Sequence, residues 1–232
     1  MTTIPRIISV DDHVVEPPDL WTSRLPAKYQ DRCPRVERDT AEFNFEGGVF
    51  SFEKGVDGGE MCDWWLYDDL VYPFPKLSAA AGFDELDVVP VTFDEIHPAG
   101  WKQADRLTAM DENHVDVSVC FPNVLPRFCG QTFYEATDRD LGLACVRAYN
   151  DFMIEEWCGD SDGALIPLII IPLWDAGLAA DEVRRNAERG CHAVCFSEIA
   201  PNLGLPSIHT GYWDPFFAAC QDTQTTVNMH IG

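Results

Sequence analysis

Apolar runs and stretches of helical spacing alternate along this sequence from residue 101 onward. The apolar runs are residues 115–121, 164–173, 192–198 and 225–231, and the helical stretches are residues 101–114, 135–158, 175–189 and 214–221. Continuous apolar runs are typical of strands that are buried on both faces, as in parallel sheets. Strands that alternate with helices in this way predict an α/β fold with a parallel sheet.

One more strand precedes this alternation and ends in acidic and histidine side chains. Residues 6–18 begin as a β-branched apolar run, continue as Asp-Asp-His, and reach two prolines that cannot continue a strand. Because side chains two positions apart share one face of a strand, we expect Asp11 and His13 to point the same way, with Ser9 beneath them. A carboxylate and an imidazole so placed can supply two ligands of a divalent metal. The alternative is a polar loop in which an aspartate forms the turn.

The last apolar run delivers another histidine, His230, near its own carboxyl end. The carboxyl ends of parallel strands in a barrel meet on one face, so Asp11, His13 and His230 would converge there. A single histidine on a strand is more often a core residue. From the residues alone, a core role and a metal site for His230 both stay open.

Residues 17–100 do not alternate strand and helix. They contain a short helix at residues 20–29, a β-hairpin at residues 43–52 with glycines at its turn, and a group of aromatic side chains between residues 64 and 74. We interpret residues 17–100 as an insertion after the first strand that caps the top of a barrel. Two roles are open for the aromatic rings: lining a substrate pocket, or packing the insertion onto the barrel.

Several segments resemble the amidohydrolase-2 branch of the amidohydrolase superfamily, the metal-dependent (β/α)8 barrels that include aminocarboxymuconate semialdehyde decarboxylase. The similar segments are D-x-H-x-x-E-P at residues 11–17, residues 106–111 leading to 121–123, residues 205–209 and 213–215, and residues 229–232. The resemblance implies a TIM barrel, of which residues 1–232 would be the N-terminal part with the first five β units. A closed barrel of this type has eight strands, so we expect the natural protein to continue beyond Gly232, with a fourth metal ligand on the last strand.

The resemblance also implies roles for individual residues. Asp11, His13 and His230 would bind a divalent transition metal. Zn, Fe and Mn are the candidates, because all three accept mixed nitrogen and oxygen ligands. Glu198 ends the strand at residues 192–198, where the wider superfamily can place a bridging ligand for a second metal; the alternative is an acid beside a helix N-terminus. Glu16 matches the motif and would be a ligand or a group that orients His13. The remaining candidates are substrate-binding residues Asn123, Trp174 and His209, and structural histidines His97, His114 and His192.

The expected reaction is hydrolysis of an amide, ester or thioester by metal-activated water, with Glu198 and Glu16 as catalytic residues. An acid on the later strands of the barrel would shuttle the proton. One alternative is non-oxidative decarboxylation of a small aromatic or muconate-like carboxylate, which relatives on the same scaffold perform. The other is a metal-free binding protein on a degenerate barrel.

The composition limits the partners. A formal net charge of -23 argues against nucleic acids and anionic membranes as partners. We expect a small-molecule substrate. We also expect the protein to form a homo-oligomer. Nine cysteines without C-x-x-C pairs are typical of reduced core thiols. The sequence shows neither a signal peptide nor an apolar run long enough for a membrane helix, which predicts a cytoplasmic protein.

Overall fold

The computed structural model describes residues 5–47, 49–85 and 87–230, and in it five parallel strands follow one another in sequence order. They are β1 (Ile7–His13), β6 (Val115–Phe121), β7 (Leu165–Ile166), β8 (Ala193–Ser197) and β9 (Thr226–His230). β1, β6 and β7 form one ladder and β8 and β9 another, and a parallel bridge between Ile169 and Val194 links the two. The α/β class is therefore confirmed.

The strand expected at residues 164–173 is only two residues long in regular pairing, Leu165–Ile166. Pro167 and Pro172 lack the N–H group that a ladder needs, which explains why the pairing is interrupted. The chain nevertheless stays in the core, because Ile169 is completely buried and exchanges backbone hydrogen bonds with the β8 strand.

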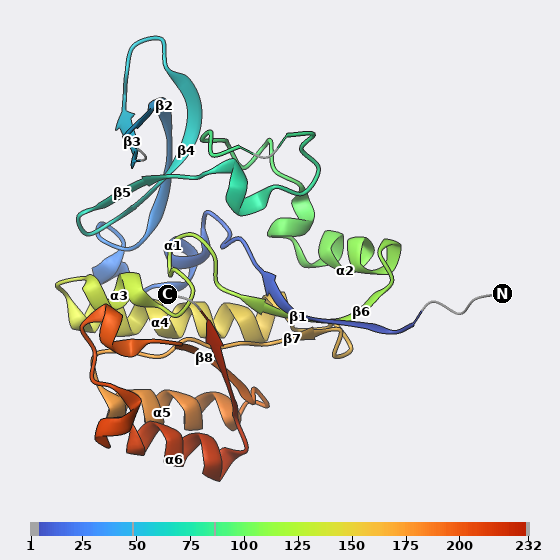
Figure 1. Ribbon diagram of the computed structural model, residues 1–232, viewed down its shortest axis with the longest axis vertical. Coiled ribbons are helices and arrows are strands. Elements are labelled where there is room, and N and C mark those ends of the chain that lie inside the picture. The colour runs from blue at the N-terminus through green and yellow to red at the C-terminus, as the bar shows by residue number, and fades with distance from the viewer. Residues whose placement is uncertain (1–4, 48, 86, 231–232) are drawn as a thin grey trace.

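The helices lie outside the strands and correspond to the expected stretches (Figure 1). They are α2 (Gln103–Glu112), α3 (Gln131–Glu135), α4 (Arg139–Phe152), which continues as a π-helical turn (Met153–Trp157), α5 (Ala176–Ala187) and α6 (Asp214–Thr223). The helix expected at residues 135–158 begins later, at Arg139, because Asp138 caps α4 by accepting from the Leu141 N–H group, and it continues directly into the π-helical turn. Asp175 caps α5 in the same way, as its position predicts.

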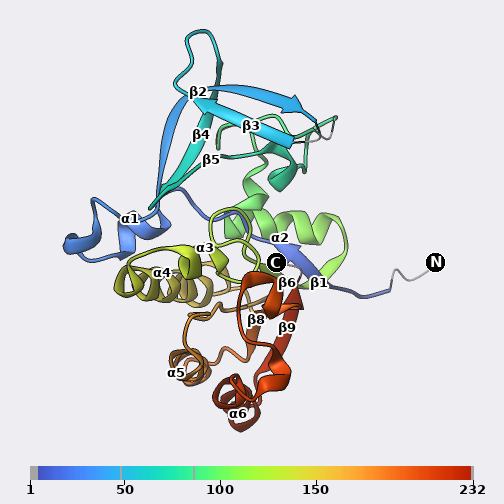
Figure 2. The same cartoon turned by 60° about the vertical axis from the view of Figure 1, so that its left-hand side comes forward.

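Residues 17–100 contain a separate antiparallel sheet with strand order β3-β2-β4-β5. Its strands are β2 (Arg35–Glu46), β3 (Val49–Lys54), β4 (Glu60–Tyr67) and β5 (Leu70–Pro73). The predicted hairpin is confirmed, because Phe43 pairs with Phe52 and Gly47 has a φ of 61°; Gly48 lies outside the described residues. Figures 1 and 2 show this sheet on the side toward which β9 runs. That it caps a barrel stays a prediction.

The remaining segments of regular structure are short. They are α1 (Leu20–Arg24) and the 3-10 turns Ala27–Tyr29, Lys76–Ala79, Pro98–Gly100, Ala200–Leu203 and Ile208–Thr210. Across the ranges 5–47, 49–85 and 87–230, no helix is long and apolar enough to cross a bilayer.

Aromatic side chains of the insertion belong to the same core as the parallel strands. The buried rings of Trp21 and Trp65 meet edge to face at 5.5 Å, and the Trp21 indole donates to the Cys145 carbonyl of α4 at 3.1 Å. Burying rings of this size is worth roughly 2–3 kcal/mol each. Packing of the insertion onto the α/β core, one of the two roles considered for these rings, is therefore present for Trp65.

Candidate metal centre

Asp11, His13 and His230 converge at the carboxyl ends of β1 and β9. One ligand atom from each lies within 4.8 Å of the others. The Asp11 Oδ1 atom is 3.3 Å from Nε2 of His230 and 4.0 Å from Nε2 of His13. The two imidazole rings meet edge to face at 5.3 Å. One carboxylate and two imidazoles at this spacing can ligate a divalent transition metal.

The backbone after β6 fixes the orientation of His13. Its Nδ1 atom lies 2.9 Å from the Pro122 carbonyl oxygen. A carbonyl only accepts, so Nδ1 carries the proton and Nε2 keeps a free lone pair that faces Asp11. Burial lowers the pKa of His13, an effect that the bond to Pro122 partly opposes. The ring is therefore neutral near pH 7, the state that metal binding requires.

Asp12 connects β1 to its neighbour β6. It accepts from the Ser9 hydroxyl at 2.8 Å and from the Ser118 hydroxyl of β6. The β1–β6 register shifts between Ser9 and Asp12. The expectation that Ser9 lies beneath Asp11 and His13 is thus wrong: simple alternation fails across the irregularity, and Ser9 faces Asp12 instead.

Arg106 of α2 binds the backbone at the carboxyl end of β1. Its guanidinium donates to the His13 carbonyl at 2.7 Å and to the Ala99 carbonyl at 2.8 Å, and lies 3.8 Å from Asp12. It also stacks over the Trp157 ring at 5.4 Å. The planar fork of arginine suits several fixed acceptors at once. Arg106 therefore positions the backbone at the end of β1, which carries the candidate ligands Asp11 and His13.

Glu16 is completely buried, and its carboxylate binds backbone N–H groups of the loop that follows β6. It accepts from Asn123 at 2.6 Å, Val124 at 3.1 Å and Leu125 at 3.4 Å. Burial raises the pKa of Glu16 to about 7, although these N–H groups oppose the rise. Because Pro122 precedes Asn123 directly, Glu16 supports the loop that orients His13.

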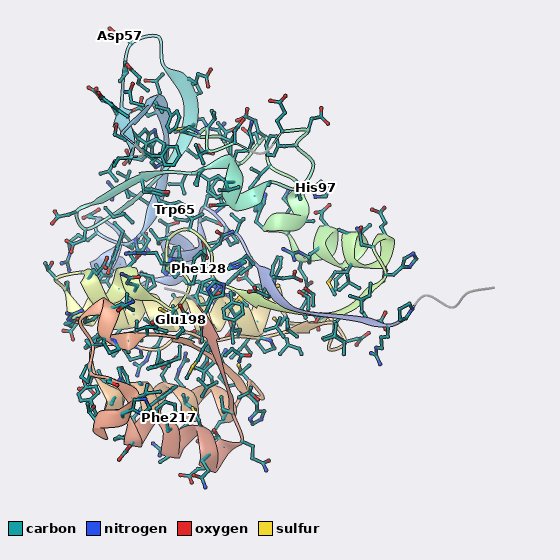
Figure 3. All side chains as sticks on the ribbon, in the orientation of Figure 1. Asp57, Trp65, His97, Phe128, Glu198 and Phe217 are labelled. Atoms are coloured by element: carbon teal, nitrogen blue, oxygen red, sulfur yellow. The ribbon has the colours of Figure 1, made fainter. Side chains whose placement is uncertain are left out.

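Two phenylalanines enclose the histidines. The Phe128 ring lies 4.5 Å from His230 and 5.1 Å from His13, and Phe121 lies 4.7 Å from His230. Figure 3 shows Phe128 near the centre of the molecule, between Trp65 and Glu198. These rings desolvate the imidazoles, which explains the lowered pKa of His13.

A cavity of about 830 Å³ adjoins this cluster through Phe128. It lies between the β4–β5 hairpin, which contributes Trp65, Tyr67 and Tyr72, and the segment from Asn123 to Thr137. Its volume falls within the ~300–1,000 Å³ typical of small-molecule sites.

The other predicted site residues lie at varying distances from the cluster. The three-membered ligand group does not include Glu198 or Glu16 among the described residues. The Glu198 side chain is exposed, but its N–H group donates to the His230 carbonyl at 3.1 Å, which places its backbone beside the cluster. Asn123 lines the cavity and donates to the Ser78 carbonyl at 2.7 Å. The roles of Glu198 and Asn123 stay predictions.

Trp174 and His209 are not among the described residues that line the cavity. Trp174 stacks with the Arg139 guanidinium at 5.1 Å, and His209 is exposed on a 3-10 turn. The histidines expected to be structural, His97, His114 and His192, lie outside the ligand group within the described part of the chain.

Sequence reasoning assigned no role to Arg106, Phe128 or the Pro122 carbonyl. Arg106 falls within a segment that resembles the family. Its position as a cation early in a helix that precedes a strand was the one feature that could have indicated its role. Phe128 lies in a stretch without helical or strand periodicity, which offers no signal of its position.

Side chains at the carboxyl ends of parallel strands commonly form the functional site of α/β barrels, and a carboxylate with two imidazoles there suits a metal. Residues 64–232 match the family described as Amidohydrolase, and the chain belongs to this amidohydrolase-2 family. The matched range includes His230 but begins after Asp11 and His13.

A solved structure has a similar fold. It is an amidohydrolase from Mycobacterium avium subsp. paratuberculosis K-10, with 21% sequence identity and a TM-score of 0.65. The match covers all of this chain and 60% of that one, so the chain spans 60% of the length of this relative. The search of curated proteins finds no match.

Proposed function

We propose that this chain binds a divalent metal and acts as part of a metal-dependent hydrolase on the carbonyl of an amide, ester or thioester. The observation that carries the proposal is the convergence of Asp11, His13 and His230 within 4.8 Å. Membership of the amidohydrolase family supports it.

The residues present fit a divalent transition metal. The donor set combines one carboxylate with imidazole nitrogens, and His13 is held in the tautomer that leaves Nε2 free. Such a metal, when bound, supplies Lewis acidity that lowers the pKa of water and polarises a carbonyl.

The surrounding residues would prepare the site for hydrolysis. Asp11 provides negative charge that balances a bound cation, while Phe121 and Phe128 limit the access of bulk water to the imidazoles. Arg106 and the Pro122 carbonyl hold the His13 backbone and ring. In the reaction the oxygen of water joins the acyl carbon, the acyl C–N, C–O or C–S bond breaks, and the leaving group takes a proton.

The two glutamates would have different tasks. Glu16 already binds three backbone N–H groups and is completely buried, which favours support of the loop over proton transfer. Glu198 is exposed at the end of β8, beside the His230 backbone, and is the candidate for proton transfer to the leaving group or for a second metal.

The test is a panel of amide, ester and thioester substrates, run beside aromatic carboxylates on protein loaded with Zn, Mn or Fe. We expect products that have gained the mass of water, and no such products from Asp11→Asn. Loss of carbon dioxide without addition of water would replace the hydrolase proposal with a decarboxylase.

A further inference from the structure

We infer that the cavity beside the metal cluster binds an uncharged or cationic aromatic group of the substrate and disfavours a carboxylate there. The inference rests on the proposed function for the identity of its ligand as a substrate. Its geometry does not depend on the reaction, because the cavity is described by its own lining residues.

The walls of the cavity are largely apolar and aromatic. β4 and β5 contribute Trp65, Leu70 and Tyr72, and the segment after β6 contributes Leu125 and Phe128. Tyr72 is 37% exposed, so its ring is available to a ligand, whereas Trp65 is completely buried and forms a fixed part of the wall. Flat rings stack on such walls with a gain of roughly 0.5–1.5 kcal/mol per pair beyond burial.

The charges around the cavity are unbalanced. Its lining includes the carboxylates of Asp68, Asp69 and Glu135, and within the described lining Arg127 is the single cation. Arg127 binds Glu135 at 3.1 Å, so its charge is already compensated. Asp68, which accepts from the Thr137 N–H group at 2.9 Å, and Asp69 then leave net negative charge in the lining, which repels an anionic group and attracts a cationic one.

Phe128 forms a wall that the cavity shares with the candidate metal cluster. One side chain both lines the cavity and packs against the rings of His13 and His230. A substrate that extends past this ring with its carbonyl at the cluster would place its adjoining group in the cavity. The part of the substrate that fits the cavity is then an acyl group or a leaving group that has an aromatic ring and lacks a carboxylate.

Three probes of matched shape test the charge preference: 2-naphthamide, 2-naphthamidine and 2-naphthoate, which are neutral, cationic and anionic near pH 7.5. Calorimetric titration of the metal-free protein removes any attraction between naphthoate and a bound metal. We expect the amide and the amidine to bind about tenfold more tightly than the carboxylate.

Matched variants locate the effect. Asp69→Lys should strengthen naphthoate binding about threefold or more, whereas Asp57→Lys, the same charge change at the far hairpin tip (Figure 3), should leave it unchanged. Tyr72→Ala should weaken all three probes, and Val71→Ala, a neighbouring exposed position outside the cavity lining, should not. Equal effects of the two lysine variants, or naphthoate as the tightest ligand, would overturn the inference. So would the absence of measurable binding of any probe.

These outcomes are separable from those of the proposed function. Charge-selective binding to metal-free protein, together with no hydrolysis by the metal-loaded protein, would sustain the cavity and remove the hydrolase proposal. Hydrolysis without charge-selective binding would support the hydrolase proposal and overturn the inference about the cavity.

Discussion

The Asp11 carboxylate on β1 lies 3.3 Å from the His230 imidazole on β9, the first and fifth of the parallel strands. Neighbouring strands are ~4.8 Å apart, so a flat sheet would separate the first strand from the fifth by about 19 Å. The sheet must therefore curl back on itself, as the sheet of a barrel does. Curvature is what turns two distant strand ends into one candidate metal centre.

Loss of a proposed ligand should weaken metal binding severely. Asp11→Asn and His230→Gln each remove one of the three converging ligand atoms. We expect zinc affinity to fall by more than the ~10–100-fold typical of losing an outer hydrogen-bond partner. Competition titration of zinc with a chelator measures this, and His192→Gln, outside the ligand group, is the control. Unchanged affinity in both ligand variants would show that the assignment is wrong.

Arg106→Lys should weaken the support of the candidate metal centre while it keeps the positive charge at position 106. Lysine cannot reproduce the planar guanidinium that binds the His13 and Ala99 carbonyls together, so these two partly buried acceptors lose hydrogen bonds. We expect a loss of about 1–3 kcal/mol in the free energy of unfolding and about tenfold weaker zinc binding. Urea unfolding and zinc titration measure the two effects. Arg184→Lys, whose ion pairs are exposed and near 4.0 Å, should change neither.

Glu16 should make stability depend on pH. Its folded pKa of about 7 lies above the ordinary value of 4.5, so the folded state binds more protons between these values. Stability from this group is therefore complete below about pH 4.5 and is lost as the pH rises through 7. The loss is on the order of 3 kcal/mol. Glu16→Gln does not titrate, so the free-energy difference between wild type and variant should shift with pH in that direction. A difference that is independent of pH would contradict the prediction.

Phe128→Ala should raise the pKa of His13 toward its ordinary value. Burial is the main cause of the lowered pKa, and the Phe128 ring covers both histidines. NMR titration of the histidine ring protons in metal-free protein measures the change. Phe217→Ala, a half-buried phenylalanine on α6 away from the cluster (Figure 3), should leave the His13 titration in place.

The strand and helix pattern was largely predictable because it depends on local periodicity. β6 has the expected bounds, Val115–Phe121, and α5 lies within the expected stretch at residues 175–189. The convergence of Asp11, His13 and His230 was also expected, since strand ends in a parallel sheet share one face.

What the sequence could not supply depends on tertiary contacts between distant segments. The register shift that moves Ser9 onto Asp12 arises from pairing with β6, not from the β1 sequence. The later start of α4, at Arg139, was hidden because residues 135–158 have helical spacing throughout, although Asp138 suits a cap. The place of Phe128 over both histidines follows from the path of an irregular loop, for which no periodicity exists.

The loop after β6 takes part in three sets of contacts. Its N–H groups bind Glu16, its Pro122 carbonyl orients His13, and its side chains form one wall of the cavity. A substitution there that admits a new ligand also disturbs the support of an imidazole. The opposite wall, with Leu70 and Tyr72, belongs to the separate antiparallel sheet. Substitutions in the antiparallel sheet can therefore reshape the cavity without touching the support of His13, whereas substitutions in the loop after β6 change both at once.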